Sequence, residues 1–141
     1  MDHAIHTWSC PNCNRPFKHK NQAHSCLKVD ANTHLENKNP NVKRIYDKLL
    51  KEVRRFGDVK VSPTKSSIMF VSKSTFVAVK PKQHWLDIEF LLDKEMIEYP
   101  IHKTGRANKS RVAHFVRLES PKDVTKKIIG WLKASYEITS R

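Results

Sequence analysis

His84-Trp85-Leu86-Asp87-Ile88-Glu89-Phe90-Leu91-Leu92 has the clearest strand pattern in this chain. Apolar residues alternate in it with a second, more polar set, and in a β-strand two such sets point to opposite faces. The apolar set is Leu86, Ile88, Phe90 and Leu92, and the other set is Trp85, Asp87 and Glu89. We therefore predict a strand in a sheet that has one covered face and one partly open face.

The segment before this strand predicts an amphipathic helix. Asn39-Pro40 is a typical start, because asparagine caps the first free amide groups and proline fits the first helical position. Gly57 is suited to end the helix. Between them, apolar residues recur at helical spacing at Val42, Ile45, Tyr46, Leu49, Leu50, Val53 and Phe56. We predict a helix over residues 40–56.

Short apolar segments separated by turn residues predict further strands over residues 59–61, 67–72, 75–80 and 111–118. Residues 103–110 are interpreted as a basic loop. Ser120-Pro121-Lys122-Asp123 has the pattern of a helix start. An apolar stripe follows it at Val124, Ile128, Leu132 and Tyr136, widened by Trp131. The predicted fold class is α+β, with a helix, a sheet of about five mainly antiparallel strands and a second helix in two layers.

A cluster of cysteine and histidine residues near the start of the chain predicts a zinc site. A Cys-x-x-Cys pair is followed by His-x-Cys, and these side chains are ligands that Zn²⁺ prefers in a tetrahedral structural site. The predicted ligands are Cys10, Cys13, His24 and Cys26. His19 and His34 are alternative ligands that rank below His24. Because four protein ligands leave no open position for water, we expect the zinc to be structural.

The spacing of the second ligand pair predicts a zinc knuckle rather than a helical finger. Residues i and i+2 point the same way on an extended segment and in nearly opposite directions on a helix. Three cysteines cannot form a complete disulfide framework, and residues 1–7 lack the apolar segment of a signal peptide. We therefore expect a reducing, cytoplasmic location. A redox Cys-x-x-Cys would require a βαβ unit, which the surrounding sequence does not predict.

Positive charge is concentrated in the larger part of the chain. Residues 1–39 carry five Lys and Arg against three Asp and Glu, a net charge of +2, whereas residues 40–141 carry twenty-two against eleven, a net charge of +11. We predict a zinc-knuckle module at 1–28, a linker at 29–39 and a basic α+β domain at 40–141. Such a charge favours nucleic acid or acidic proteins as partners. No apolar run approaches the ~20 residues of a membrane span.

Several blocks of this sequence resemble a known family. Besides the Cys/His opening from Trp8 to Cys26, they are Val61-Ser62-Pro63-Thr64-Lys65, Lys82-Gln83-His84-Trp85-Leu86-Asp87 and His114-Phe115-Val116-Arg117-Leu118. Together they resemble small bacterial proteins that join such an opening to the domain of unknown function family 5655. The resemblance covers nearly the whole chain, and it implies an α+β fold and no established reaction.

Basic and aromatic residues near the predicted open face form a candidate nucleic-acid surface. Lysine and arginine can neutralise phosphates, and Trp85 can stack on a base. The candidate residues are Lys65, Lys80, Lys82, Trp85, Lys103, Arg106, Lys109, Arg111 and Arg117. Asp87 and His114 complete this polar cluster. We interpret Asp87 as paired with Arg117 or Lys80, and His114 as a hydrogen-bonded, partly buried histidine because it shares strand parity with core residues.

These features favour a zinc-binding, non-enzymatic basic protein that binds nucleic acid, either RNA or single-stranded DNA. A protein-interaction module with an acidic protein as partner is the alternative. An enzyme that uses His114 and Asp87 as an acid–base pair next to Lys82 is a third class. No nucleophile motif, Gly-rich phosphate loop or His-Glu-x-x-His accompanies that pair. The sequence indicates neither the oligomeric state nor the kind of nucleic acid.

Overall fold

The structure is a computed structural model of the 141-residue chain, and it describes residues 8–9, 16–17 and 31–140. The chain divides into two compact units, residues 1–30 and residues 31–141. In the first unit, strand β1 (Trp8–Ser9) pairs antiparallel with β2 (Pro16–Phe17), so that Trp8 lies opposite Phe17. The predicted zinc ligands lie outside the described residues; they are Cys10, Cys13, His24 and Cys26.

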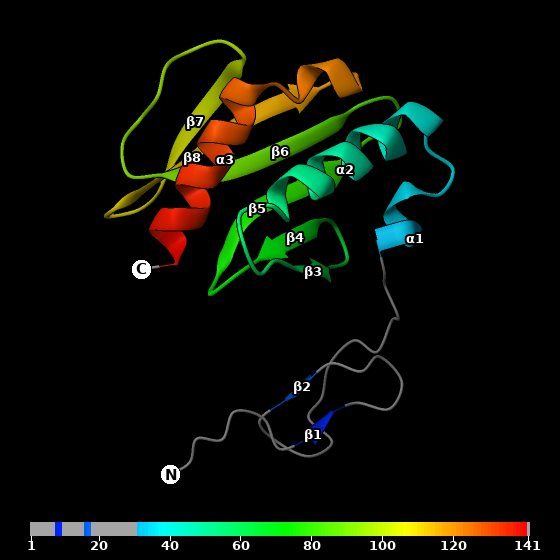
Figure 1. Cartoon of the computed structure of the whole chain (residues 1–141), viewed down its shortest axis with the longest axis horizontal. Helices are drawn as coiled ribbons and strands as arrows, with labels where there is room; N and C mark the ends of the chain where they lie inside the picture. Colours follow the sequence, from blue (N-terminus) through cyan, green and yellow to red (C-terminus); the bar gives the residue numbers. More distant parts are fainter. Residues whose placement is uncertain (1–7, 10–15, 18–30, 141) are drawn as a thin grey trace. The chain divides into compact units, whose positions relative to one another are not determined.

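The second unit is a six-stranded antiparallel sheet with two long helices packed on one face (Figure 1). The strands lie in the order β3-β4-β5-β6-β8-β7. Their bounds are β3 Lys60–Pro63, β4 Ile68–Val71, β5 Thr75–Pro81, β6 Leu86–Leu92, β7 Ile101–Asn108 and β8 Arg111–Leu118. The helices are α1 (Ala31–Leu35), α2 (Pro40–Val53), the short 3₁₀ helix η1 (Pro121–Asp123) and α3 (Lys126–Thr139). The predicted α+β class is confirmed.

Helix α2 begins where the sequence predicts and ends slightly earlier. The Asn39 side chain accepts a hydrogen bond from the Asn41 N–H at 2.9 Å, and Pro40 occupies the first turn. The apolar stripe is buried against the sheet, with Val42, Ile45, Leu49 and Val53 fully enclosed. The helix ends at Val53 rather than at residue 56, and the chain turns before Gly57, whose φ of 151° favours glycine.

The predicted alternation of β6 is confirmed and separates the two faces of the sheet. Leu86, Ile88, Phe90 and Leu92 are buried under the helices, whereas the intervening residues are only half-buried. One irregularity occurs in β5, where Phe70 pairs with Val77 and Val71 pairs with Thr75, so Phe76 is an extra residue in the strand. The Ser135 hydroxyl of α3 donates a hydrogen bond of 2.7 Å to the Phe76 carbonyl, which joins the helix to this bulge.

The prediction of a basic loop at residues 103–110 is wrong, because residues 103–108 belong to strand β7 and only Lys109 and Ser110 form a turn. The strand pairs along β8, with Thr104 opposite His114 and Gly105 opposite Ala113. It lies at the sheet edge, and most of its side chains are exposed, so no apolar alternation marks it in the sequence. The sheet therefore has six strands instead of about five.

Two helical segments differ in detail from the sequence prediction. The predicted linker at residues 29–39 contains helix α1, whose His34 Nε2–H donates a hydrogen bond of 2.6 Å to the Thr64 carbonyl. At the second predicted helix start, Asp123 accepts hydrogen bonds from the backbone N–H groups of Glu119 and Ser120, but only η1 forms there. The long helix α3 starts separately, with Thr125 as its N-cap.

In the described part of the chain, no helix combines the length and the apolar character that crossing a membrane would require.

Candidate nucleic-acid interface

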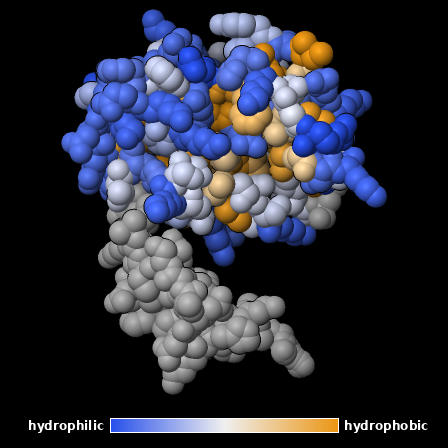
Figure 2. Space-filling model, turned by 180° about the vertical axis from the view of Figure 1, so that it is seen from behind, coloured by the Kyte–Doolittle hydropathy of each residue, from blue (hydrophilic) through white to orange (hydrophobic). Residues whose placement is uncertain are grey.

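The sheet face opposite α2 and α3 is open, and Figure 2, seen from behind the view of Figure 1, shows apolar residues across its middle among hydrophilic ones. The strand register places two rows of side chains on this face. Lys80, Asp87 and Arg117 are neighbours across β5, β6 and β8, and Ala78, Glu89, Phe115 and Lys103 form the next row, which extends to β7. We define the open-face cluster as Lys80, Trp85, Asp87, Glu89, Lys103, Phe115 and Arg117.

Arg117 forms the centre of this cluster with Trp85 and Asp87. Its guanidinium carbon lies 4.3 Å from the centroid of the Trp85 ring, which is a cation–π contact. Its Nε lies 3.5 Å from Asp87 Oδ1, as the sequence interpretation of Asp87 anticipated. The Arg117 side chain is 48% exposed, so the outer surface of the guanidinium stays open to a ligand. Arginine planes of this kind can stack on nucleobases.

Phe115 provides a second aromatic ring, which the sequence analysis did not include among the candidates. Its ring is partly exposed, and the Lys103 ammonium nitrogen lies 5.2 Å from its centroid. Strand parity could have identified Phe115, because the interpretation of His114 as an inward residue places the next residue on the open face. The contact with Lys103 could not be found in the same way, since it depends on the pairing of β7 with β8.

Two carboxylates moderate the positive charge of the open face. Lys80 Nζ lies 3.7 Å from Glu89 Oε1, and Asp87 accompanies Arg117. Three cations and two carboxylates leave the open-face cluster with a net charge of +1. Lys103 makes no ion pair with any described residue and is therefore available to an anion.

The structure places the other basic candidates at two opposite ends of the sheet. Lys65 lies in the β3–β4 turn and Lys82 in the β5–β6 turn, at the end where Trp85 and Arg117 lie. The other end is the β7–β8 hairpin, which contributes Arg106, Lys109 and Arg111. Arg111 and Arg117 are six positions apart on β8, which corresponds to roughly 20 Å.

The arginines of the hairpin are engaged with backbone carbonyls. Arg106 Nη1 donates hydrogen bonds to the carbonyls of Asn108 and Lys109 at 3.4 Å and 3.2 Å. Arg111 donates through Nη1 to Ser110 and through Nη2 to Ile138, near the end of α3. The hairpin therefore has its own local hydrogen bonds and lies apart from the Trp85–Arg117 end of the open face.

The acid–base pair of the enzyme alternative is not brought together. His114 is fully buried on the helix side of β8, where its ring stacks on Phe90 with 5.5 Å between centroids. Asp87 lies on the opposite face. Both ring nitrogens of His114 are engaged, with Val112 O at 3.0 Å from Nδ1 and the Met96 N at 2.8 Å from Nε2. His114 is thus a hydrogen-bonded core residue, as its strand parity indicates, and it is buried completely.

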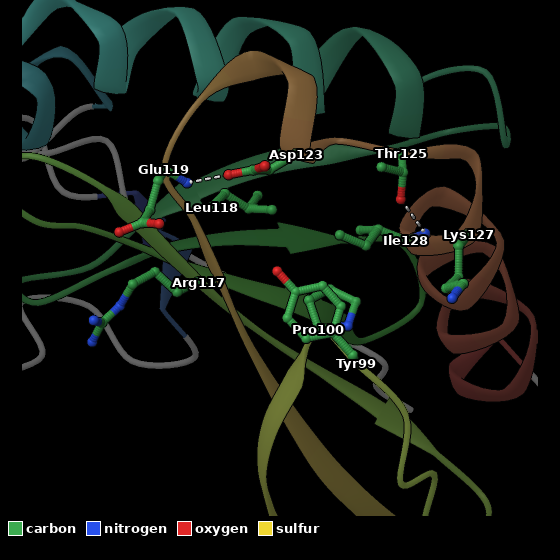
Figure 3. Close-up of a pocket in the computed structure, with 9 residues that line it drawn as sticks. All are labelled: Tyr99, Pro100, Arg117, Leu118, Glu119, Asp123, Thr125, Lys127 and Ile128. Carbon is green, nitrogen blue, oxygen red and sulfur yellow. Dashed lines mark hydrogen bonds between the residues drawn. The ribbon is translucent and has the colours of Figure 1, made fainter.

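A pocket of about 290 Å³ lies beside the end of β8 (Figure 3). The Arg117 side chain points away from Tyr99 and Pro100 in this view, so its guanidinium belongs to the open face rather than to the pocket. Lys127 pairs with Glu98 at 2.7 Å. The lining residues are Tyr99, Pro100, Arg117, Leu118, Glu119, Asp123, Thr125, Lys127 and Ile128. With its charges balanced in this way, the pocket does not extend the basic surface.

Among residues 8–9, 16–17 and 31–140, no group of three or more His, Cys, Asp or Glu side chains could hold a metal ion. Of the histidines considered as zinc ligands, only His34 is described, and its Nε2 bonds to Thr64. His24 and His19 lie outside that part of the chain.

Comparison with known proteins identifies the family of the second unit. The model, described as a domain of unknown function (DUF5655), matches residues 31–139. Neither a curated protein nor a solved structure matches the chain. The matched residues coincide with the second unit, which carries the whole open-face cluster.

Proposed function

The chain belongs to the DUF5655 family, whose description assigns no activity, and from the geometry of the open face we propose that it binds single-stranded nucleic acid. The observation that carries this proposal is that both partly exposed aromatic rings of the open-face cluster hold a cation beside them. Arg117 accompanies Trp85, and Lys103 accompanies Phe115. Aromatic rings and arginine planes stack on bases, and lysine and arginine neutralise phosphates.

The layout of the open-face cluster suits an extended single strand of nucleic acid rather than a duplex. Phe115 lies opposite Glu89 of β6, and Trp85, directly before the start of β6, precedes Glu89 by four residues. The two rings are therefore separated by about 13 Å along the strands. Arg117 lies between them in the register. This spacing leaves room for successive bases and places a cation next to each stacking position.

Titration of fluorescent single-stranded RNA and DNA at two salt concentrations tests the proposal. Affinity should fall steeply with salt, because phosphate contacts release counterions. Lys103→Ala should lower the slope of log affinity against log salt by about 1. Lys73→Ala is the matched control, since Lys73 lies in the exposed β4–β5 turn, and it should bind as the unmodified chain does. An equal effect of the two substitutions would exclude the open face as the binding surface.

A second candidate function is docking of a protein partner on the same face. It is favoured by the half-buried apolar side chains of Met69, Val71 and Leu91, which lie on the open face beside the cluster. Apolar contacts resist salt, whereas phosphate contacts do not. Failure to bind either nucleic acid at low salt would favour docking of a protein.

The first unit supports a separate proposal, a structural zinc knuckle formed by Cys10, Cys13, His24 and Cys26. The proposal rests on the ligand pattern and on the antiparallel pairing of β1 with β2, which brackets the Cys-x-x-Cys segment in the sequence. In a reducing cytoplasm such a cluster favours metal over disulfides. Metal analysis of the purified chain should give about one equivalent of zinc, which Cys10→Ser should abolish.

A further inference from the structure

A groove of about 500 Å³ runs between α2 and α3 on the helix layer, away from the open-face cluster. On α3, Lys126, Gly130 and Lys133 lie at the helical spacing i, i+4 and i+7, which places them on one face. The other side is formed by Lys48 and Glu52 of α2 and by Arg55 in the turn that follows the helix. The groove is lined by Lys48, Glu52, Arg55, Val124, Thr125, Lys126, Ile129, Gly130 and Lys133. Its length corresponds to seven helical residues, roughly 10 Å.

The walls of the groove carry charge of mainly one sign. Four cations face one carboxylate, because Lys48 and Arg55 lie on one side and Lys126 and Lys133 on the other. Arg55 lies 3.6 Å from Glu52, and Lys48 Nζ donates a hydrogen bond of 3.0 Å to the Pro121 carbonyl. Lys126 and Lys133 have no ion pair with any described residue. Like charges across a groove repel one another, and a bound anion would relieve this repulsion.

Gly130 gives the groove an unfilled floor. It lies inside α3, where glycine is less favourable than alanine by about 1 kcal/mol. Nothing lies within 4 Å of the position that its Cβ would take. Its φ is not positive, so the backbone does not require a glycine there. A missing side chain in this place allows a ligand to approach the helix backbone closely.

We propose that this groove binds a small anion with several phosphate groups, such as a nucleoside polyphosphate or a short inorganic polyphosphate. The volume lies within the usual range of small-molecule sites, about 300–1,000 Å³. Cations on both walls over a length of roughly 10 Å match a chain of successive phosphates better than a single ion. Val124 and Ile129 supply the apolar part of the lining. The site is separate from the nucleic-acid surface proposed above.

Calorimetric titration of the full chain with sodium tripolyphosphate tests the proposal, and parallel titration with ATP distinguishes the two sources of phosphate. The double variant Lys126→Ala/Lys133→Ala should weaken tripolyphosphate binding at least about tenfold. The control Lys73→Ala/Lys94→Ala removes the same charge from exposed turn and loop positions and should bind as the unmodified chain does. No binding of either anion, or an equal loss in both double variants, would overturn the proposal.

Gly130→Ala provides a second test that does not depend on charge. A methyl group should raise the Tm, because it improves helix propensity without a clash, and it should weaken tripolyphosphate binding by filling the floor. An unchanged affinity, or a lower Tm, would contradict the role of Gly130. Binding of single-stranded RNA should stay the same in all groove variants. Failure of the groove can therefore be distinguished from failure of the open face.

Discussion

The backbone N–H of Met96 donates a hydrogen bond of 2.8 Å to Nε2 of His114, which lies 18 residues further along the chain. Because an amide can only donate, Nε2 must be the acceptor, and the ring proton must lie on Nδ1. Nδ1–H then donates to the Val112 carbonyl at 3.0 Å. The neutral form of His114 thus holds the β6–β7 connection against β8, and a second proton would break the bond to Met96.

This arrangement predicts that the protein loses stability in mild acid. Burial lowers the pKa of His114 below its ordinary value of 6.5, although the bond to Val112 and the charge of Glu95 oppose the shift. The unfolded chain therefore takes up a proton at a higher pH than the folded chain does. The stabilisation is fully present above pH 6.5 and is lost as the pH falls from there toward the lowered pKa. Urea unfolding at pH 7.5 and 5.5 measures this loss as a decrease in the free energy of unfolding.

His114→Gln separates this effect from other titrating groups. A glutamine amide does not titrate in this range, so the unfolding free energy of the variant should change less between the two pH values. The variant should be less stable than the unmodified chain at pH 7.5, because its packing on Phe90 is altered. A pH dependence equal to that of the unmodified chain would show that His114 does not cause it.

Removal of the Ser135 hydroxyl should have a second, larger effect on stability. Its hydroxyl donates to the Phe76 carbonyl at 2.7 Å and accepts from the Leu91 N–H at 3.0 Å, so it bridges β5 and β6 just beyond Val77 and Phe90, the end pair of their ladder. Ser135→Ala should leave two backbone groups unpaired and cost about 2–4 kcal/mol of unfolding free energy. Ser140→Ala is the control, because its hydroxyl bonds only within the end of α3. Equal urea midpoints for Ser135→Ala and Ser140→Ala would show that the Ser135 hydroxyl does not stabilise the fold as a bridge between β5 and β6.

The fold could be predicted from the sequence where burial is one-sided. The alternation in β6 and the apolar stripe of α2 each reflect one buried face, so their periods of 2 and 3.6 are visible in the residues. Strand β7 has no such period. Its edge position leaves residues on both sides exposed, and basic residues such as Lys103 and Arg106 give the segment the composition of a loop. Its pairing with β8 follows from the sheet topology, which no local pattern reveals.

The candidate site, like the fold, could be predicted only where a local pattern in the sequence marks it. Trp85 and Asp87 could be assigned to the open face by parity alone. The contact between Lys103 and Phe115 depends on strand order, because β7 follows β6 in the chain but lies beyond β8 in the sheet. The groove between α2 and α3 was also hidden. Lys126 and Lys133 line this groove together with Lys48 and Arg55 only because of the way the two helices pack, which no local pattern reveals.

Substitution of Gly57 should destabilise the protein because of the backbone conformation at this position. Its φ of 151° is unfavourable for other residues, and a Cβ there would collide with the Tyr136 hydroxyl. Gly57→Ala should therefore cost about 1–3 kcal/mol of unfolding free energy. Gly105→Ala is the matched control, since its φ is not positive and no atom lies within 4 Å of the added methyl group. A similar urea midpoint for both variants would contradict this.

Substitution of Arg117 should separate the contribution of stacking to nucleic-acid affinity from the contribution of charge. Arg117→Lys keeps the positive charge but removes the planar group beside Trp85, so the salt slope for single-stranded RNA should stay the same. The affinity should nevertheless fall about fivefold to a hundredfold, the equivalent of one lost base stack. Lys80→Arg, a charge-conserving change in the same row, should leave the affinity nearly unchanged. If Arg117→Lys leaves both the salt slope and the affinity unchanged, Arg117 contributes only its charge, and the stacking role is wrong.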